Sequence, residues 1–291
     1  MQPLDGLRVV ELCEGIAGPW AGRLLAGYGA DVIKVEPPNG DRCRALGPFP
    51  SDDPNPETGA LHLHLNTGKR AVVGAVGDDL VDRLIAGADI VLQSRAVIDP
   101  ETIEERHPGM VLVTVTSFGL VGRYNWCHGE EIIHYAMGGP MSASGDPERE
   151  PLKMGGDLGQ YQCGTLTATA ALAAVAAQRR SGRSIHVDMS NIDTQITSID
   201  RRMTFLLYNS YRGENVPRSG GYNTSIFPGG CRPALDGHVQ VSTLMNWLPR
   251  MVAVMNDPEM SSLYEDPAWI INQDLPEIAD GRLLEWTLGR D

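Results

Sequence analysis

An acidic residue after two glycines is the first feature of this sequence with clear chemical potential. Asp157 stands directly before a proline-free segment, rich in Ala and Leu, over residues 160–180. The segment ends at Ser181-Gly182, so it predicts a helix with a glycine stop. We expect Asp157 at the amino end of this helix, where aspartate is a favoured N-cap and where free backbone N–H groups and the helix dipole can hold an oxyanion.

Arginine dominates the basic residues. Lys34, Lys69 and Lys153 are the only lysines, and arginine suits bidentate contacts with phosphate or carboxylate groups. An anionic cofactor is therefore compatible with the sequence. The whole chain nevertheless has 37 acidic against 24 basic residues and a formal net charge of −13. Because this field repels a polyphosphate backbone, we expect no nucleic-acid binding.

The cysteines and the apolar runs narrow the class of protein further. The five cysteines lack CxxC spacing, so the sequence predicts neither a metal site nor a disulfide framework. No stretch reaches the roughly 18 uninterrupted apolar residues of a membrane span, and the N-terminus lacks a basic region followed by an apolar signal run. We expect a cytoplasmic protein without membrane contact. The cysteines are Cys13, Cys43, Cys127, Cys163 and Cys231.

Short apolar runs alternate with helical segments through the first 210 residues. The run over 7–12 leads through a helical segment to a second run over 31–36, which is one βαβ unit. The same alternation continues, and it predicts an α/β fold with a Rossmann-like, doubly wound parallel sheet and helices on both faces. The later predicted strands cover 71–76, 89–92, 110–116 and 184–190, and the later predicted helices cover 78–86, 100–107, 160–180 and 191–208.

The composition changes after this region. Residues 213–230 are dense in Gly, Pro, Ser and Asn, which predicts a linker or loop. We therefore predict a large Rossmann-like domain over 1–210, a linker over 211–230 and a smaller α+β domain over 231–291. Within the smaller domain we expect a strand over 237–241 and helical stretches around 247–255 and 281–288.

An ordered series of strings along the chain resembles the family III CoA-transferases. This group includes formyl-CoA and carnitine CoA-transferases and α-methylacyl-CoA racemase. Phe227-Pro228 with the residues over 236–239 resembles the start of the family's smaller domain. The other matching strings are Ala17–Pro19, Gly29–Pro38, Gly40-Asp41, Asn66–Arg70, Thr116–Gly119 with Gly122, Ser181–Arg183 and Val187–Ser190.

The resemblance implies a large CoA-binding domain, a small domain and two subunits that thread through each other. This sequence stops at Asp291, where the family's small domain continues, so we expect a small domain that is short for the family. Two explanations stay open: a truncation, or one subunit of a two-chain assembly. The implied assembly is an intertwined homodimer or a heteromer with a homologous subunit.

The resemblance also implies the reaction. Family members move CoA between an acyl-CoA donor and a carboxylic acid through an aspartate carboxylate, which is ionised at neutral pH and can form covalent acyl intermediates. Alignment forward from the two glycines places this aspartate at Asp157. Counting back from Gly164 places it at Gln160, which cannot form an anhydride. Glu131 matches the family's acidic position near the thioester.

Two other functions stay open at this stage. The Gln160 alignment and the early C-terminus favour a non-catalytic CoA-binding subunit of a heteromeric transferase. The third reading is a 2-methylacyl-CoA racemase, with His128 and Asp157 as acid and base on opposite sides of the α-carbon. The ordinary alternative for His128 is a polar loop residue, and we expect His134 to pack with one hydrogen bond satisfied.

CoA is expected to pass Gly15, Ile16 and Ala17, where small residues let the backbone approach a ligand. No metal cofactor is expected. The alternative for each cation near the phosphates is a solvated surface position, and for Lys34 it is a structural role at a strand end. A glycine loop over 219–222 is a candidate active-site cover. The residues expected near CoA further include Lys69, Arg70, Arg42 or Arg44, His128, and Ser94-Arg95, which replace the family's usual Asn-Phe.

Overall fold

The computed structural model describes residues 2–145, 148–197, 202–214, 229–242, 247–265 and 274–290. The chain divides into two compact units: unit 1 is Met1–Met141 with Lys153–Asn215, and unit 2 is Ser142–Leu152 with Val216–Asp291. The glycine loop over 219–222 and the Phe227-Pro228 match lie outside the described residues. The domain boundaries predicted from the sequence stay a prediction.

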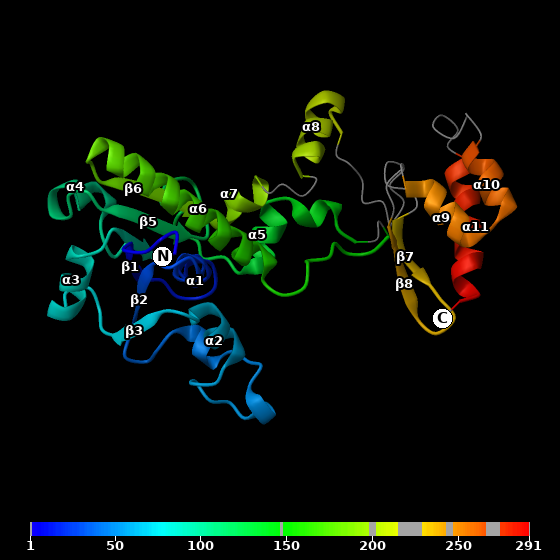
Figure 1. Cartoon of the computed structure of the whole chain (residues 1–291). Helices are drawn as coiled ribbons and strands as arrows, with labels where there is room; N and C mark the ends of the chain where they lie inside the picture. The colour runs from blue at the N-terminus through cyan, green and yellow to red at the C-terminus, as the bar shows by residue number, and fades with distance from the viewer. Residues whose placement is uncertain are drawn as a thin grey trace. The chain divides into compact units, whose positions relative to one another are not determined.

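Unit 1 is built on a six-stranded sheet in which all neighbouring strands run parallel (Figure 1). The strand order is β3-β2-β1-β4-β5-β6, which is the order of a Rossmann-like doubly wound sheet. This confirms the fold class predicted from the sequence. The strands are β1 (Arg8–Leu12), β2 (Asp31–Glu36), β3 (Arg70–Val73), β4 (Ile90–Gln93), β5 (Val111–Thr116) and β6 (Ile185–Ser190).

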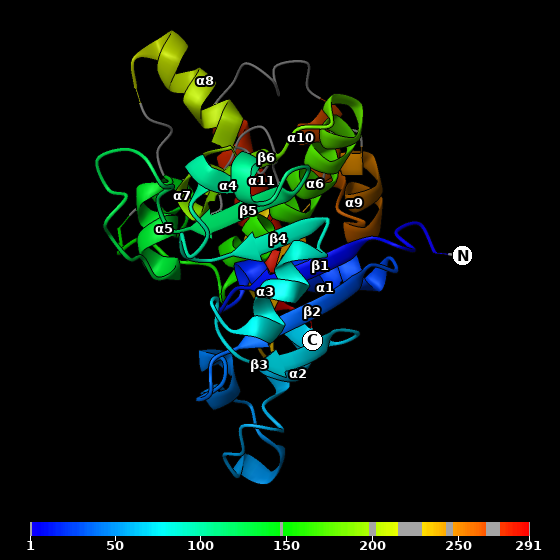
Figure 2. The same ribbon diagram turned by 90° about the vertical axis from the view of Figure 1, so that its left-hand side faces the viewer.

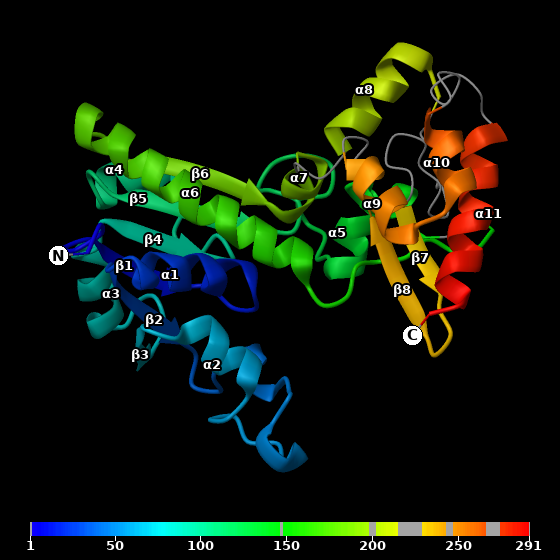
Figure 3. The same ribbon diagram turned by 45° about the vertical axis from the view of Figure 1, so that its right-hand side comes forward.

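Helices cover both faces of this sheet (Figures 2 and 3). On one face α1 (Ala17–Gly27) and α6 (Leu158–Ser181) form an apolar cluster with alternate strand residues such as Val9, Leu92 and Val113. On the other face α3 (Asp79–Ala86) and α4 (Ile103–Arg106) pack on the intervening residues, such as Val10, Val91 and Leu112. Successive strand side chains point to opposite faces, so a sheet buried on both sides requires the continuous apolar runs of this sequence.

A glycine sets the distance between α1 and α6. A Cβ atom on Gly164 would lie 2.4 Å from the carbonyl oxygen of Ala17 and 2.9 Å from the Trp20 ring. The indole Nε1 of Trp20 donates to Thr165 Oγ1 at 3.0 Å. The backbone of α6 at Gly164 therefore lies so close to α1 that only glycine fits at this position.

The remaining helices of unit 1 complete the connections. The single helix predicted over 191–208 is wrong, because the first helix ends at Ile196 and the next described helix begins at Arg202. The helices are α2 (Ala60–Asn66), α5 (Glu131–Met137), α7 (Asn191–Ile196) and α8 (Arg202–Arg212), with 3-10 turns at Arg42–Ala45, Pro50–Asp52, Pro100–Thr102 and Pro140–Ala143.

The described residues of unit 2 form an antiparallel hairpin and three helices. Its apolar core includes Leu248, Met260 and Leu283, and Arg232 on the hairpin forms a buried ion pair with Asp280. The mixture of strands and helices agrees with the predicted α+β character. The elements are β7 (Gly229–Pro233), β8 (His238–Ser242), α9 (Leu248–Met255), α10 (Pro258–Glu265) and α11 (Asp274–Leu288). Within the described part of the chain, no helix combines the length and the apolar character that a membrane crossing requires.

The contact between α1 and α6 is testable by substitution. We expect Gly164→Ala to lower the free energy of unfolding by about 1–3 kcal/mol, because the added methyl group must push α1 and α6 apart. Gly27→Ala is the matched control, since a Cβ atom there meets nothing within 4 Å. Alanine at position 27 should be neutral or stabilising by up to about 1 kcal/mol. Urea unfolding of both variants measures the difference, and equal stabilities would contradict the packing argument.

Candidate active site

The strand order changes direction between β1 and β4. Open α/β sheets bind ligands in the crevice that forms at this point, outside the carboxyl ends of the strands. The loop after β1 carries Glu14 and Gly15, and the loop after β4 carries Ser94 and Arg95. The backbone N–H of Glu14 donates to Ser94 Oγ at 3.3 Å, so Ser94 joins the two loops, while Arg95 is exposed.

The loop after β1 is shaped by Gly15. This residue is buried and has a φ of +81°, a conformation that favours glycine. Its N–H donates to Asp41 Oδ1 at 3.4 Å, and its carbonyl accepts from Cys43 Sγ at 3.3 Å. Ile16 is buried among apolar side chains, including Cys43 and Leu65, and Ala17 is buried in the main core. The side chains of Ile16 and Ala17 therefore belong to the core, and the CoA contact expected for these two residues stays a prediction.

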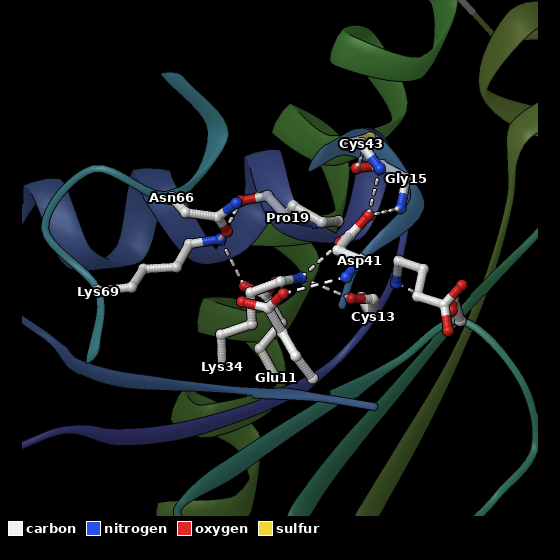
Figure 4. A network of polar contacts seen from close by, with 12 residues as sticks. Glu11, Cys13, Gly15, Pro19, Lys34, Asp41, Cys43, Asn66 and Lys69 are labelled. Atoms are coloured by element: carbon white, nitrogen blue, oxygen red, sulfur yellow. Dashed lines mark hydrogen bonds and ion pairs between the residues drawn. The ribbon is translucent and has the colours of Figure 1, made fainter. Parts of the chain in front are cut away.

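A buried network of four charged side chains lies beneath this loop (Figure 4). Lys34 Nζ contacts Glu11 Oε1 at 3.0 Å and Asp41 Oδ2 at 2.8 Å, and it donates to the carbonyl of Cys13 at 2.8 Å. Lys69 Nζ contacts Glu11 Oε2 at 2.7 Å. The Lys34 side chain is 1% exposed. Two ammonium groups and two carboxylates thus neutralise each other inside the protein.

Burial and charge act against each other on the two lysines. Burial opposes the charged form of Lys34, but the carboxylates of Glu11 and Asp41 outweigh it and raise the Lys34 pKa. For Lys69 burial is the larger effect and lowers the pKa, while Glu11 opposes the shift. Lys34 therefore has a structural role, which was predicted from the sequence as the alternative to a phosphate contact.

Lys69 is committed to protein oxygens. Besides Glu11, its ammonium donates to the carbonyl of Pro19 at 2.7 Å and to Asn66 Oδ1 at 2.9 Å. An ammonium group has three donors, so this geometry leaves none for a phosphate oxygen. The phosphate contact predicted for Lys69 stays a prediction, and this arrangement does not favour it.

A second set of carboxylates lies at the amino end of α6. Glu131 is 5% exposed; its Oε1 accepts from the N–H of Gly159 at 2.6 Å and its Oε2 from the N–H of Gln160 at 3.2 Å. Asp157 occupies the N-cap position, is half-buried and makes no side-chain cap hydrogen bond. Glu131 therefore caps the helix in place of Asp157. The N–H groups of Gly159 and Gln160, expected to be free for an oxyanion, already have an acceptor.

Burial raises the pKa of Glu131, and the charge of Asp157 adds to the rise, while the two backbone N–H groups oppose it. Gly159 is required for this arrangement. A Cβ atom there would lie 2.5 Å from Gln195 Nε2 and 2.8 Å from Glu131 Oε1. Gly159 was not singled out from the sequence, because the crowding comes from α5 and α7 and leaves no local signal. Gln160 is buried in the same turn.

Arg42 connects the two parts of the site. A Cβ atom on Gly15 would lie 2.8 Å from Arg42 Nη2, so the guanidinium lies over the Gly15 turn. Arg42 Nη1 also lies 3.8 Å from Glu130 Oε1, and both side chains are exposed, at 58% and 76%. Glu130 directly precedes Glu131. The structure thus brings Gly15, Arg42 and the start of α5 together.

Other predicted residues lie apart from this group. Arg70 pairs with Asp31, the first residue of β2, at 2.5 Å, which directs it toward the amino end of the strands. His128 is exposed in the loop before α5. The expected packing of His134 is confirmed, since it is 2% exposed, but the expected hydrogen bond is wrong, because neither ring nitrogen has a hydrogen-bond partner among the described residues. Burial lowers its pKa to about 4.

An aromatic cluster next to Gln160 was missed from the sequence. The rings of Trp20 and His64 stack at 5.4 Å, and Tyr161 meets Trp20 edge-on at 5.1 Å. The Arg23 guanidinium lies 5.1 Å from the Trp20 ring centroid. These residues come from α1, α2 and α6, so no sequence spacing connects them.

A cavity of about 330 Å³ lies beside α2, β2 and β3. Arg44 on its wall binds Glu36 through two hydrogen bonds of 2.7 and 3.0 Å. Burial opposes ionisation of Glu36, but Arg44 and the N–H of Asp41 outweigh it and lower the Glu36 pKa to about 2. The lining residues are Lys34, Glu36, Arg44, His62, Leu63, Asn66, Thr67, Lys69, Arg70 and Ala71. In the described parts of the chain no three His, Cys, Asp or Glu side chains are grouped to hold a metal ion.

Removal of the Glu131 carboxylate should loosen the start of α6. We expect Glu131→Ala to lower the free energy of unfolding by about 1–3 kcal/mol, because the buried N–H of Gly159 loses its acceptor and the N–H of Gln160 keeps only the carbonyl of Asp157, at 3.1 Å. Glu131→Gln keeps one acceptor oxygen and should cost less. The neighbouring Glu130→Ala is the control and should change stability by less than about 0.5 kcal/mol. Chemical denaturation at pH 7 checks this, and equal values for positions 130 and 131 would refute the capping role.

Comparison with known proteins identifies the family of this chain. Residues 4–291 match the sequence profile of CoA-transferase family III. The chain is 35% identical over 250 residues to a succinate–glutarate CoA-transferase of Agrobacterium fabrum, covering 81% of this chain and 62% of the relative. It is 31% identical to a succinyl-CoA:mesaconate CoA-transferase of Haloarcula marismortui, covering 100% of this chain and 76% of the relative.

Solved structures lead to the same family. A CAIB/BAIF family protein from Brucella suis superposes with a TM-score of 0.83 at 28% identity, covering 100% of this chain and 79% of that structure. The chain spans less than two thirds of the length of the Agrobacterium relative. The ordered sequence strings, the doubly wound sheet and the profile match over residues 4–291 together place this chain in CoA-transferase family III.

Proposed function

We propose that this protein moves CoA between an acyl-CoA donor and a carboxylic acid, with Asp157 as the carboxylate that carries the acyl group. The observation that supports this role is the state of Asp157. Its side chain is half-buried at the amino end of α6 and has no cap hydrogen bond, because Glu131 takes over the capping. A carboxylate without a capping role in the helix can act as a nucleophile.

The proposed reaction has balanced steps. A carboxylate oxygen of Asp157 attacks the carbonyl carbon of the thioester, and the C–S bond breaks. CoA departs as the thiolate, and the acyl group is now joined to Asp157 as a mixed anhydride. The thiolate then attacks the aspartyl carbonyl, which releases the first carboxylic acid and gives an Asp157–CoA thioester. The second acid attacks this thioester and the same exchange runs in reverse order, which returns the free aspartate and the new acyl-CoA.

Charged neighbours support this role for Asp157. Lys153 donates to the carbonyl oxygens of Met154, at 2.7 Å, and of Gly156 in the turn that leads to Asp157. Its ammonium therefore lies in the same turn as the nucleophile. Glu131 acts as a positioning residue, since its carboxylate fixes the first turn of α6 behind Asp157.

We propose a dicarboxylic acid as the acceptor. The relatives named above act, by name, on succinate, glutarate and mesaconate. Arg42 is exposed over the Gly15 turn and can pair with the second carboxylate of such an acid or with a CoA phosphate. We further propose a cytoplasmic location and an intertwined homodimer or a heteromer with a homologous subunit, which native mass spectrometry of the purified chain would distinguish.

A second function, a non-catalytic CoA-binding subunit, depends on the alignment at Gln160. Gln160 is buried in the first turn of α6 and its N–H is bound to Glu131. If Gln160 holds the position of the family aspartate, that position has no carboxylate. A homologous partner subunit would then supply the nucleophile.

Trapping of the covalent intermediate decides between these functions. We expect incubation with succinyl-CoA to add the mass of CoA or of the acyl group to the peptide that contains Asp157, as read by mass spectrometry. Asp157→Asn should lower kcat by at least about a thousandfold, because the nucleophile is lost.

The matched control is Asp78→Asn, since Asp78 occupies the same N-cap position of α3 without a cap hydrogen bond there. It should keep full activity. Transferase activity that survives in Asp157→Asn, or an adduct on another residue, would overturn the assignment. CoA binding with no transfer until a partner is added would favour the second function.

A further inference from the structure

The two carboxylate oxygens of Asp41 serve different parts of the molecule. Oδ1 accepts from the N–H of Cys43 at 2.8 Å and from the N–H of Gly15 at 3.4 Å. Oδ2 lies 2.8 Å from Lys34 Nζ. The N–H of Asp41 itself donates to Glu36 Oε2 at 3.0 Å. Asp41 is buried, so this carboxylate is fixed in one orientation.

Asp41 and Lys34 bracket the loop after β1. Lys34 donates to the carbonyl of Cys13 at 2.8 Å, while Asp41 accepts from the N–H of Gly15 (Figure 4). The two members of one ion pair therefore bind the chain on the two sides of Glu14, Lys34 at Cys13 and Asp41 at Gly15. A buried ion pair has little freedom to change geometry, because separation of its charges leaves each one desolvated. The contacts with Asp41 and Lys34 therefore stabilise the left-handed backbone conformation of Gly15.

The same contacts determine where Arg42 lies. Asp41 caps the 3-10 turn that starts at Arg42, and the guanidinium then lies over Gly15, 2.8 Å from the place a Cβ atom would take. Lys34 and Lys69 are neutralised within the network, whereas Arg42 faces solvent and reaches Glu130 only across 3.8 Å. Such an exposed pair is weak and screened by water. The charge of Arg42 is thus available to an anionic ligand.

We propose that Asp41 is a positioning residue that holds the Gly15 turn and the Arg42 guanidinium together as a preformed receptor for the anionic part of a CoA thioester. The inference rests on the proposed function, because it takes CoA as the ligand. Preorganisation raises affinity because binding then requires no ordering of the turn or of the guanidinium. Asp41 acts through Gly15 and Arg42 and does not itself touch the ligand.

Calorimetric titration of free CoA into the full chain tests this, with folding of each variant checked by its melting temperature. We expect Asp41→Ala to raise the Kd for CoA at least about tenfold. Asp41→Asn should raise it less, because the amide oxygen still accepts from Gly15 and Cys43. Arg42→Met, an exposed substitution, should weaken binding without a change in melting temperature and should reduce the salt dependence of Kd.

Asp89→Ala is the matched control. Its carboxylate accepts from the N–H of Arg8 at 2.8 Å, also across a long stretch of sequence, but at the amino end of the strands. It should lower the melting temperature and leave Kd unchanged. In the double variant Asp41→Asn/Arg42→Met the losses of affinity should be less than additive, since both substitutions remove the same contact.

The outcomes separate the two proposals. Absence of CoA binding by the wild-type chain overturns the proposed function. Wild-type binding with an unchanged Kd in the Asp41 variants, or with additive losses in the double variant, overturns the positioning role alone. If the Asp41 variants do not fold, Arg42→Met decides, and an unchanged Kd in that variant also counts against the inference.

Discussion

The buried network of Glu11, Lys34, Asp41 and Lys69 is the constraint on which the rest of the site depends. Four charges have been removed from water, which is tolerable only because each ammonium meets carboxylate and carbonyl oxygens at close range. Loss of one partner would leave an uncompensated buried charge. The network therefore fixes β1, β2, the Asp41 turn and the loop before β3 relative to one another.

A loop held by such a network has a defined conformation. Gly15 is held by Asp41, and Ser94 ties the loop after β1 to the loop after β4. These contacts are made by backbone N–H groups, so they depend little on side-chain identity in the loop itself. The charged residues beneath the loop after β1 hold its conformation.

The start of α6 uses a related arrangement. A buried carboxylate from another helix, Glu131, accepts two backbone N–H groups and so leaves Asp157 without a capping role. Burial of the Glu131 carboxylate disfavours its charged form and raises its pKa. The side chains around Glu131 also leave no room for a side chain at position 159, which is glycine. One carboxylate holds the helix, and a second is available for chemistry.

The sequence by itself determined the fold class and the order of its elements. Continuous apolar runs such as 110–113 are typical of a parallel sheet covered by helices on both sides, and the ordered strings from Ala17 to Ser190 pointed to the family. It also placed Asp157 next to a helix, because helix composition and glycine stops are local signals.

Only the tertiary structure decided which charges are available. In the sequence, Lys69 and Arg42 were equivalent as cations near a predicted ligand. In the structure, the Lys69 ammonium donates to Glu11, Pro19 and Asn66, whereas Arg42 lies exposed over Gly15. Arg70 is paired with Asp31, and His134 is buried with no hydrogen-bond partner among the residues that the structure describes. The partners in each case come from segments distant in sequence. Burial and hydrogen-bond geometry depend on all of these segments at once, so no local pattern of residues carries that information.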